Sequence, residues 1–265
     1  MISINVYPLP SYAQDEDLTD SVAVVIDVLR ATTVIVSAFA GGVKDVIPVL
    51  DIEQARQQKE LLEKKYGKGS VLLGGERKGI PIAGFDLGNS PQHFTSEKIA
   101  DKILILTTTN GTVALHAAKK ARNLYVAGLV NAQAVVERLK NENKIAIFCA
   151  GTDGEITEED LLLAGCLVSR LSRNFRQDQC QNQYQNQCRN QCRNQCQWNH
   201  HAETAKQLWE NRFFIDNNES VSESGLIEFL YQSRGGKNLI MLGLEADIAV
   251  AAKIDSIDLV PEIHL

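Results

Sequence analysis

The sequence predicts a single α/β domain spanning residues 1–265, with three layers in which helices cover both faces of a largely parallel sheet. Three observations favour this fold class. Short apolar segments alternate with amphipathic ones along most of the chain, which is the order of a strand–helix–strand protein. Several apolar segments are nearly continuous, as in strands that are covered on both faces. The chain is also long enough for such a domain to bury a sizeable core.

Seven apolar segments are the predicted strands, and five amphipathic segments between them are the predicted helices. The strands are ISINVY (2–7), VAVVI (22–26), DVIPVL (45–50), VLLGG (71–75), KILILT (102–107), NLYVAG (123–128) and KIAIFCA (144–150). The helices are 31–40, 52–65, 111–120, 131–141 and 158–173. In such sheets, ligands bind beyond the carboxyl ends of the strands, beside helix N-termini.

The last part of the chain continues this pattern after an interruption. Residues 201–210 and 221–232 are predicted helices, and residues 233–265 are predicted to form a glycine turn, two short helical pieces and a final strand. Between them, residues 176–197 (RQDQCQNQYQNQCRNQCRNQCQ) consist almost only of Gln, Asn, Cys and Arg, which predicts a low-complexity insertion without a packed core. Its cysteines at 188, 192 and 196 could bind a soft metal, or they could reflect a tandem sequence duplication. Cys149 and Cys166 lie in apolar segments and are predicted core thiols.

Charge and hydropathy exclude some functional classes. The net charge is −6 and the pI is about 5.5, whereas general nucleic-acid binders are usually basic. The start of the chain, MISINVYPLP, lacks the pattern of a signal peptide, and no apolar stretch reaches the roughly 18 residues that a membrane span needs. We therefore expect a cytoplasmic protein that binds neither nucleic acid nor membrane, with a homodimer as a reasonable assembly for its size.

Polar side chains of the same chemical kind follow four of the predicted strands. They are Asp27, Arg30, Thr32 and Thr33 after the second strand, Glu76 and Arg77 after the fourth, Thr107 to Thr112 after the fifth, and Thr152, Asp153, Glu158, Glu159 and Asp160 after the seventh. In a parallel sheet these groups would face the same side. Carboxylates suit Mg²⁺, arginines grip phosphate or sulfonate, and helix N-termini favour anions. This combination is typical of a metal-assisted phosphoryl-transfer site.

Each group also has a structural explanation. Asp27 and Arg30 could form a salt bridge at a helix start, the threonines could be N-caps, and Asn110-Gly111 could be a tight turn. The occurrence of four such clusters at four strand ends favours the functional interpretation. No GxxxxGK[ST] motif is present, so nucleotide binding is not indicated.

The segment GGERKGIPIAGFDLGNSP (74–91) is predicted to be a long loop, and loops of that length tend to be functional. Asp86, Asn89 and Ser90 could bring further polar groups near Glu76 and Arg77. The alternative is a glycine-rich crossover with a turn before Pro91.

Five motifs, in register, resemble the 2-phosphosulfolactate phosphatase family. They are DVLRATT, GGERKGIPIAGFDLGNSP, TTTNGT, VNAQAVVERL and CAGTDGEITEEDLLLAG. The resemblance covers residues 1 to about 172 and resumes at 235–261, while the Gln/Asn/Cys tract departs from the family pattern. It implies an α/β/α fold and a Mg²⁺-dependent acid phosphatase that hydrolyses (R)-2-phospho-3-sulfolactate to 3-sulfolactate and phosphate, a step of coenzyme M biosynthesis.

These considerations assign a role to each candidate residue. Asp27, Glu76 and one acid of the 159–160 pair, with Asp160 favoured, are expected to hold Mg²⁺. The predicted catalytic residues are Asp27, Arg30, Arg77 and Asn110. The predicted substrate-binding residues are Thr32, Thr33, Thr108, Thr109, Gly111, Asp86 and Asn89. The expected nucleophile is a water molecule activated by the metal, with Asp27 as a covalent nucleophile the alternative.

Two other functions remain open. One is the hydrolysis of another small phosphorylated acid. The other is a non-catalytic anion-binding protein, although several carboxylates would repel an anion unless a cation lay between them. A nucleotide hydrolase ranks below both, because it would need a purine pocket and aromatic residues make up only 6% of the chain.

Overall fold

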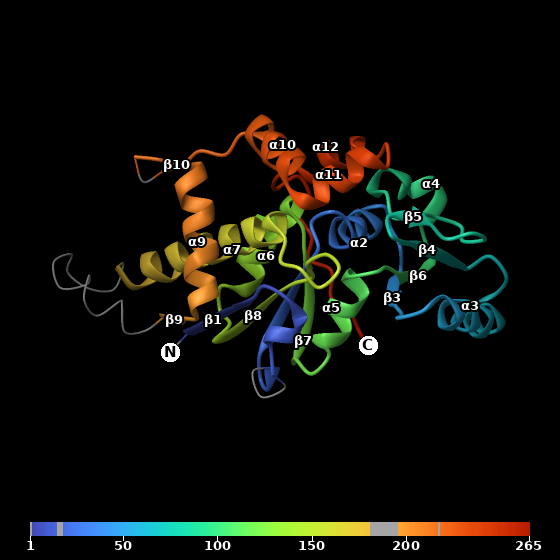
Figure 1. The fold of residues 1–265 in the computed structure, drawn as a ribbon. Helices are drawn as coiled ribbons and strands as arrows, with labels where there is room; N and C mark the ends of the chain where they lie inside the picture. Colours follow the sequence, from blue (N-terminus) through green and yellow to red (C-terminus); the bar gives the residue numbers. More distant parts are fainter. Residues whose placement is uncertain (1, 15–17, 181–195, 217) are drawn as a thin grey trace.

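Two β-sheets form the framework of the protein in a computed structural model, which describes the chain except for residues 1, 15–17, 181–195 and 217 (Figure 1). The central sheet is parallel throughout, in the order β7–β2–β8–β1–β9. Its strands are β1 (Ile2–Tyr7), β2 (Val22–Ile26), β7 (Asn123–Ala127), β8 (Lys144–Cys149) and β9 (Cys196–Trp198).

The second sheet has the order β3–β6–β4–β5. Strands β3 (Asp45–Pro48), β6 (Ile103–Thr107) and β4 (Val71–Arg77) are parallel, and β5 (Ile80–Pro81) pairs antiparallel with β4. The α/β class and the largely parallel central sheet are therefore confirmed. The division of the predicted strands between two sheets is a feature that the sequence pattern does not reveal.

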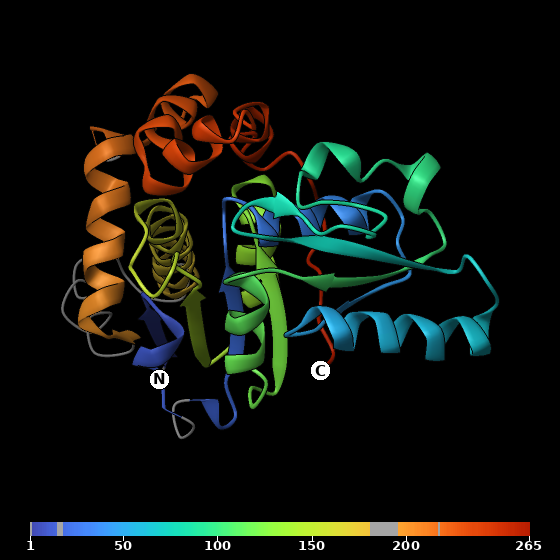
Figure 2. The same ribbon diagram turned by 45° about the vertical axis from the view of Figure 1, so that its right-hand side comes forward.

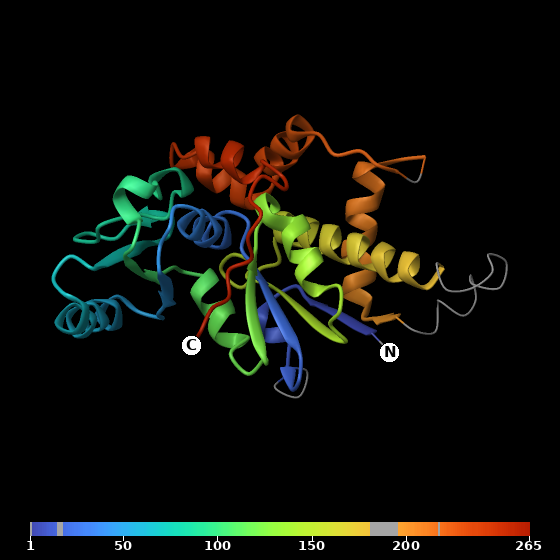
Figure 3. The ribbon, with the colours of Figure 1, turned by 180° about the vertical axis from the view of Figure 1, so that it is seen from behind.

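Helices cover both faces of the central sheet. Helices α6 (Ala132–Leu139), α7 (Glu158–Cys180) and α9 (His200–Phe213) lie on one side, and α2 (Ala31–Ala40) and α5 (Gly111–Ala117) lie on the other (Figures 1 and 3). Helix α3 (Ile52–Tyr66) runs along the second sheet (Figure 2) and packs against it through Ala55. Strand β2 shows why its sequence is continuously apolar: Val22, Val24 and Ile26 pack in one core cluster, while Ala23 and Val25 pack in the other.

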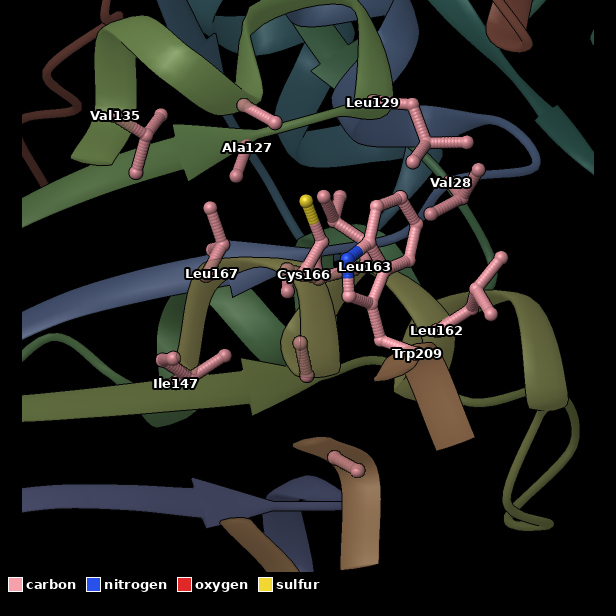
Figure 4. Close-up of a cluster of buried hydrophobic side chains, with 14 of the residues drawn as sticks. Val28, Ala127, Leu129, Val135, Ile147, Leu162, Leu163, Cys166, Leu167 and Trp209 are labelled. Atoms are coloured by element: carbon pink, nitrogen blue, oxygen red, sulfur yellow. The ribbon is translucent and has the colours of Figure 1, made fainter. Parts of the chain in front are cut away.

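The larger core cluster lies between the central sheet and α7. Figure 4 shows Leu163, Cys166 and Leu167 of α7 near Ile147 of β8 and the fully buried Trp209 of α9. Cys149 and Cys166 are buried free thiols, as predicted.

Three helices lie over the carboxyl end of the central sheet, above α2 in Figure 1. They are α10 (Glu223–Gln232), α11 (Arg234–Met241) and α12 (Ala246–Ala251). The predicted glycine turn is wrong, because Ser233 caps α11 by accepting a hydrogen bond from the Gly236 N–H at 3.1 Å, which makes both glycines part of its first turn. The predicted final strand is also wrong: the chain after α12 forms only an isolated bridge between Glu262 and Tyr125 of β7.

The remaining elements are short. They are the 3₁₀ turns η1 (Pro10–Tyr12), η2 (Pro91–His93) and η3 (Leu129–Asn131), helix α4 (Ser96–Ile99), and the hairpin of β10 (Phe214–Ile215) and β11 (Asn218–Glu219). The first residues of the Gln/Asn/Cys tract, up to Cys180, continue α7, and Cys196 begins β9. Cys188 and Cys192 lie outside the described residues, so soft-metal binding there stays a prediction. No helix among the described residues is long and apolar enough to cross a membrane.

Candidate active site

A cavity of about 590 Å³ opens where the carboxyl ends of β2, β4, β6 and β8 face α11. It brings together predicted site residues from segments far apart in the sequence. These are Asp27, Arg30, Glu76, Asn89, Thr109 and Asn110. The coincidence of polar clusters at strand ends therefore does indicate one site, although the strands belong to two sheets.

Asp27 lies at the end of β2 and is only 8% exposed. Its Oδ1 accepts a hydrogen bond from the Ala31 N–H at 3.2 Å, at the start of α2. Its Oδ2 faces Gly111, where an added Cβ would lie 2.8 Å from this oxygen and 2.4 Å from the Ala31 Cβ. Glycine at 111 thus allows α5 to approach the carboxylate closely. The pKa of Asp27 is raised to about 7, mainly by burial and also by the nearby Glu76 and Glu159, while the Ala31 N–H and Arg30 oppose the shift.

Glu76 is the second-last residue of β4 and is fixed by donors from two loops. Its Oε1 accepts a hydrogen bond from the Thr109 N–H at 2.7 Å. Its Oε2 accepts bonds from the Gly79 N–H at 2.6 Å and the Thr109 hydroxyl at 3.1 Å. This carboxylate is held rigidly at the cavity wall, and Thr109 acts mainly by orienting it. Asn110 lies beside it, and its Oδ1 accepts a bond from the Asp153 N–H at 3.2 Å.

Arg30 is buried and held by two acceptors. Its Nη1 donates to Asp247 Oδ2 at 2.8 Å, and its Nη2 donates to the Gly79 carbonyl at 3.0 Å. Asp247, on α12, also accepts bonds from the Ser90 hydroxyl at 2.5 Å and from Gln92 Nε2 at 3.2 Å. The sequence analysis missed Asp247, and the only local signal is an acidic residue in the apolar run ADIAVAA. Ser90 is thus connected to Arg30 only indirectly, through its hydrogen bond to Asp247.

Four predicted substrate contacts are structural instead. The Thr32 hydroxyl accepts from the Asp27 N–H at 2.9 Å and donates to the Asp27 carbonyl at 2.8 Å. The Thr33 hydroxyl donates to the Val28 carbonyl at 2.8 Å. The Thr108 hydroxyl accepts from the Thr112 N–H at 3.1 Å. These three threonines are buried and bind local backbone groups, which shapes the turns after β2 and β6.

The fourth is Asp86, which lies outside the cavity lining. Its Oδ2 accepts bonds from Lys59 Nζ and from the Leu73 N–H, both at 2.8 Å, outside the cavity. Arg77, a predicted catalytic residue, also lies away from the cavity. Its guanidinium donates to the Glu76 carbonyl at 2.7 Å and to the Thr107 hydroxyl at 2.9 Å, and it does not line the cavity.

Strand geometry explains the displacement of Arg77. Successive side chains of β4 point to opposite faces, so Arg77 points away from the face that carries Glu76. The cation that lines the cavity beside Glu76 is the next residue, Lys78. The sequence analysis missed Lys78. Side-chain alternation along β4 could have indicated that Arg77 points away from Glu76, but Lys78 lies in the turn after the strand.

The acid pair at the start of α7 also differs from expectation. Asp160 Oδ1 accepts a bond from the Val28 N–H at 2.9 Å, and Oδ2 accepts one from the Gly151 N–H at 3.0 Å. Both oxygens thus join the backbone after β2 to the backbone after β8. Glu159 Oε1 accepts a bond from the Gly235 N–H at 2.9 Å, but its buried Oε2 has no hydrogen-bond partner among the described residues. The geometry therefore favours Glu159 over the predicted Asp160 as the acid available to a cation.

Both acids share the strong burial of Asp27. Burial raises the pKa of Glu159, and it raises the pKa of Asp160 well above its usual value, with Asp27 and Glu159 adding to the shift at Asp160. Helix α11 packs closely here, since an added Cβ at Gly235 would lie 2.1 Å from Glu159 Oε1. Two consecutive glycines at 235 and 236 were a signal of such a close approach.

The donor set fits a hard divalent cation. Asp27, Glu76 and Glu159 are carboxylates, and their mutual repulsion is what a cation would relieve. In the part of the chain that the structure describes, no three Asp, Glu, His or Cys side chains form a complete ligand cluster. Mg²⁺ does not require one, because it is usually bound by one or two carboxylates, with water and substrate oxygens completing the shell. Asn89 Oδ1, which is buried and has no hydrogen-bond partner in the described part of the chain, adds an unsatisfied acceptor at the cavity.

Comparison with known proteins identifies the family. A family model described as 2-phosphosulpholactate phosphatase matches residues 7–264. A probable 2-phosphosulfolactate phosphatase from Clostridium perfringens is 37% identical over 262 residues, covering 98% of this chain and 93% of the relative. Another from Thermotoga maritima is 41% identical over 239 residues, covering 90% and 87%. The chain, with its cavity of buried acids and Arg30 at the strand ends, thus belongs to the 2-phosphosulfolactate phosphatase family.

Proposed function

We propose that this protein is a phosphoric monoester hydrolase that cleaves (R)-2-phospho-3-sulfolactate with water, giving 3-sulfolactate and inorganic phosphate, and that it uses Mg²⁺. The observation that carries the proposal is the placement of Asp27, Glu76 and Arg30 together at the cavity, in a chain of this family. A third acid, Glu159, lies close enough to Asp27 to raise its pKa. A buried group of acids beside an arginine suits a cation and a phosphoryl group together.

The metal would be held by Asp27 and Glu76, and Glu159, which lies near Asp27, has an oxygen, Oε2, without a hydrogen-bond partner among the described residues. When bound, Mg²⁺ would supply Lewis-acid stabilisation of the phosphoryl oxygens and would lower the pKa of water. The preference for Glu159 over Asp160 follows from their hydrogen bonds, because both Asp160 oxygens already accept backbone N–H bonds.

The chain's own residues bind and orient the substrate. A guanidinium has five N–H donors, and Asp247 and Gly79 engage only one on each Nη of Arg30, so the others can bind phosphoryl oxygens. The Asn110 Oδ1 is engaged by Asp153, which fixes the side chain and leaves its amide N–H groups as donors. Water is the proposed nucleophile, with Asp27 as a covalent nucleophile the alternative.

A non-catalytic anion receptor is a weaker explanation of the same cavity. Several of the acids around the cavity would repel an anionic ligand, and Arg30 is already paired with Asp247. An anion would therefore gain little here unless a cation were bound at the same time.

The test is the release of inorganic phosphate from 2-phosphosulfolactate, with Mg²⁺ and with a chelator, compared with 2-phospholactate, 2-phosphoglycerate and phosphoglycolate. We expect metal-dependent turnover that is selective for the sulfonated substrate. Equal turnover of all four esters would keep the phosphatase and reject the substrate. An absence of turnover in folded, Mg²⁺-supplied protein would favour the anion receptor.

Three accompanying expectations stay predictions: the cytoplasmic location, the homodimer and the place of the reaction in coenzyme M biosynthesis. The small anionic substrate is part of the present proposal.

A further inference from the structure

The cavity contains two cations of different character among the described residues. Arg30 is buried, and its charge is compensated by Asp247 at 2.8 Å. Lys78 is exposed at the rim, and within the described part of the chain its ammonium group forms no ion pair. An unpaired cation facing a cavity is available to an anionic ligand at little desolvation cost.

The backbone of Lys78 is fixed to the same groups that form the site. The residue lies in the turn between β4 and β5, at a φ of 53°, and its N–H donates to the Thr109 hydroxyl at 3.2 Å. The next residue, Gly79, donates its N–H to Glu76 Oε2 and accepts a bond from Arg30 Nη2. The position of Lys78 relative to Glu76 and Arg30 is therefore set by direct hydrogen bonds.

We propose that Lys78 determines specificity by binding the sulfonate of the substrate. This rests on the proposed function, which places the phosphoryl group by Asp27, Glu76 and Arg30. In 2-phosphosulfolactate, the carboxylate carbon is attached directly to the carbon that carries the phosphate, whereas the sulfonate sulfur is one bond further away. The deep groups engage the phosphoryl end, and the long flexible side chain of Lys78 at the rim engages the more distant anion.

The neighbouring surface provides a matched control. A second cavity, of about 730 Å³, also borders α11 and is lined by Arg234 and Lys237. Arg234 is paired with Glu155. Lys237 is an exposed lysine that lines this cavity and not the active-site cavity. Replacement of Lys237 changes the local charge by the same amount as replacement of Lys78 without touching the proposed sulfonate site.

The experiment compares the wild type with Lys78→Met, Lys78→Arg and Lys237→Met. We expect Lys78→Met to lower kcat/KM for 2-phosphosulfolactate by roughly 10- to 100-fold, mostly through KM, since a hydrogen bond to a charged group contributes about 1.5–3 kcal/mol. The factor by which kcat/KM falls should be at least ten times larger for 2-phosphosulfolactate than for 2-phospholactate, which lacks only the sulfonate. Lys78→Arg should recover most of the activity, and Lys237→Met should match the wild type. Equal losses for both substrates, or no loss, would overturn the proposal.

A binding measurement separates failure of this proposal from failure of the proposed function. In titration calorimetry, 3-sulfolactate should bind Lys78→Met at least tenfold more weakly than it binds the wild type or Lys237→Met. Equal dissociation constants in the three proteins, or no binding to the wild type, would refute the role of Lys78. Turnover of 2-phosphosulfolactate by the wild type tests the phosphatase independently.

Discussion

Removal of the Asp247 carboxylate should destabilise the protein strongly. This side chain is 1% exposed and accepts hydrogen bonds from Arg30, Ser90 and Gln92. In Asp247→Ala, the buried Arg30 guanidinium would lose its counter-charge, and breaking a buried ion pair from one side costs about 3–5 kcal/mol. Since domains of this kind are stable by about 5–15 kcal/mol, the loss would be a large share of the total. Urea unfolding followed by circular dichroism measures it.

Two further variants separate charge from shape at this position. Asp247→Asn keeps an oxygen acceptor and the same volume, so we expect a smaller loss of about 1–3 kcal/mol. The double variant Arg30→Met/Asp247→Leu removes both charges and should recover most of the stability lost in Asp247→Ala, although not the activity. A loss below about 1 kcal/mol in Asp247→Ala, or strictly additive effects in the double variant, would refute the reasoning.

Three other predictions concern the acids of the cavity. Gly111→Ala places a Cβ 2.8 Å from Asp27 Oδ2, and the forced shift should lower kcat/KM about 100-fold. Gly67→Ala is strained at its φ of 100°, but its added Cβ meets no atom within 4 Å, so this variant should lose some stability and retain full activity. Equal activity in the two variants would contradict this. Without Mg²⁺, the free energy of unfolding should fall as pH rises from about 4 to about 7, because folded Asp27, with a pKa of about 7 instead of 3.8, keeps a proton that the unfolded chain has lost. Urea unfolding at several pH values should show a weaker dependence of this free energy on pH in Asp27→Asn. The same dependence in the variant and the wild type would count against the raised pKa. Glu159→Gln should weaken Mg²⁺ binding about tenfold in titration calorimetry, and an unaltered affinity would exclude this acid from the metal site.

Much of the fold follows from local physical rules. Strand β2 and helix α2 have the predicted bounds, because a strand buried on both faces and a helix that follows it leave a clear apolar pattern. The pairing of strands is different, since β3, β4, β5 and β6 form a separate sheet through contacts between distant segments. The predicted final strand failed for a related reason: an apolar segment at the end of the chain can pack on β7 without forming a regular ladder.

The residues of the candidate site were predictable where their position depends only on the ends of strands. Asp27, Glu76 and Asn110 lie at the cavity because they lie at or shortly after the carboxyl ends of strands that converge there. Side-chain direction was harder to predict: Arg77, the last residue of β4, points away from the cavity, whereas Lys78 in the following turn lines it. Hydroxyl groups were overestimated as ligands, because buried threonines satisfy nearby backbone groups first.

Contacts from distant helices had no local signal. Asp247 reaches Arg30 across 217 positions of sequence. The choice between Glu159 and Asp160 depends on which backbone N–H groups lie near each oxygen, and adjacent residues on one helix do not reveal that.

The most direct test of the account is the rate of phosphate release from 2-phosphosulfolactate at saturating Mg²⁺ by the wild type and by Asp27→Asn. Asparagine keeps the size of the side chain and removes the charge that would hold the metal. We predict metal-dependent turnover by the wild type and a loss of at least about 100-fold in the variant, which should fold with equal or greater stability near neutral pH. Turnover by a folded Asp27→Asn protein at the wild-type rate would contradict the assignment of this cavity as the active site.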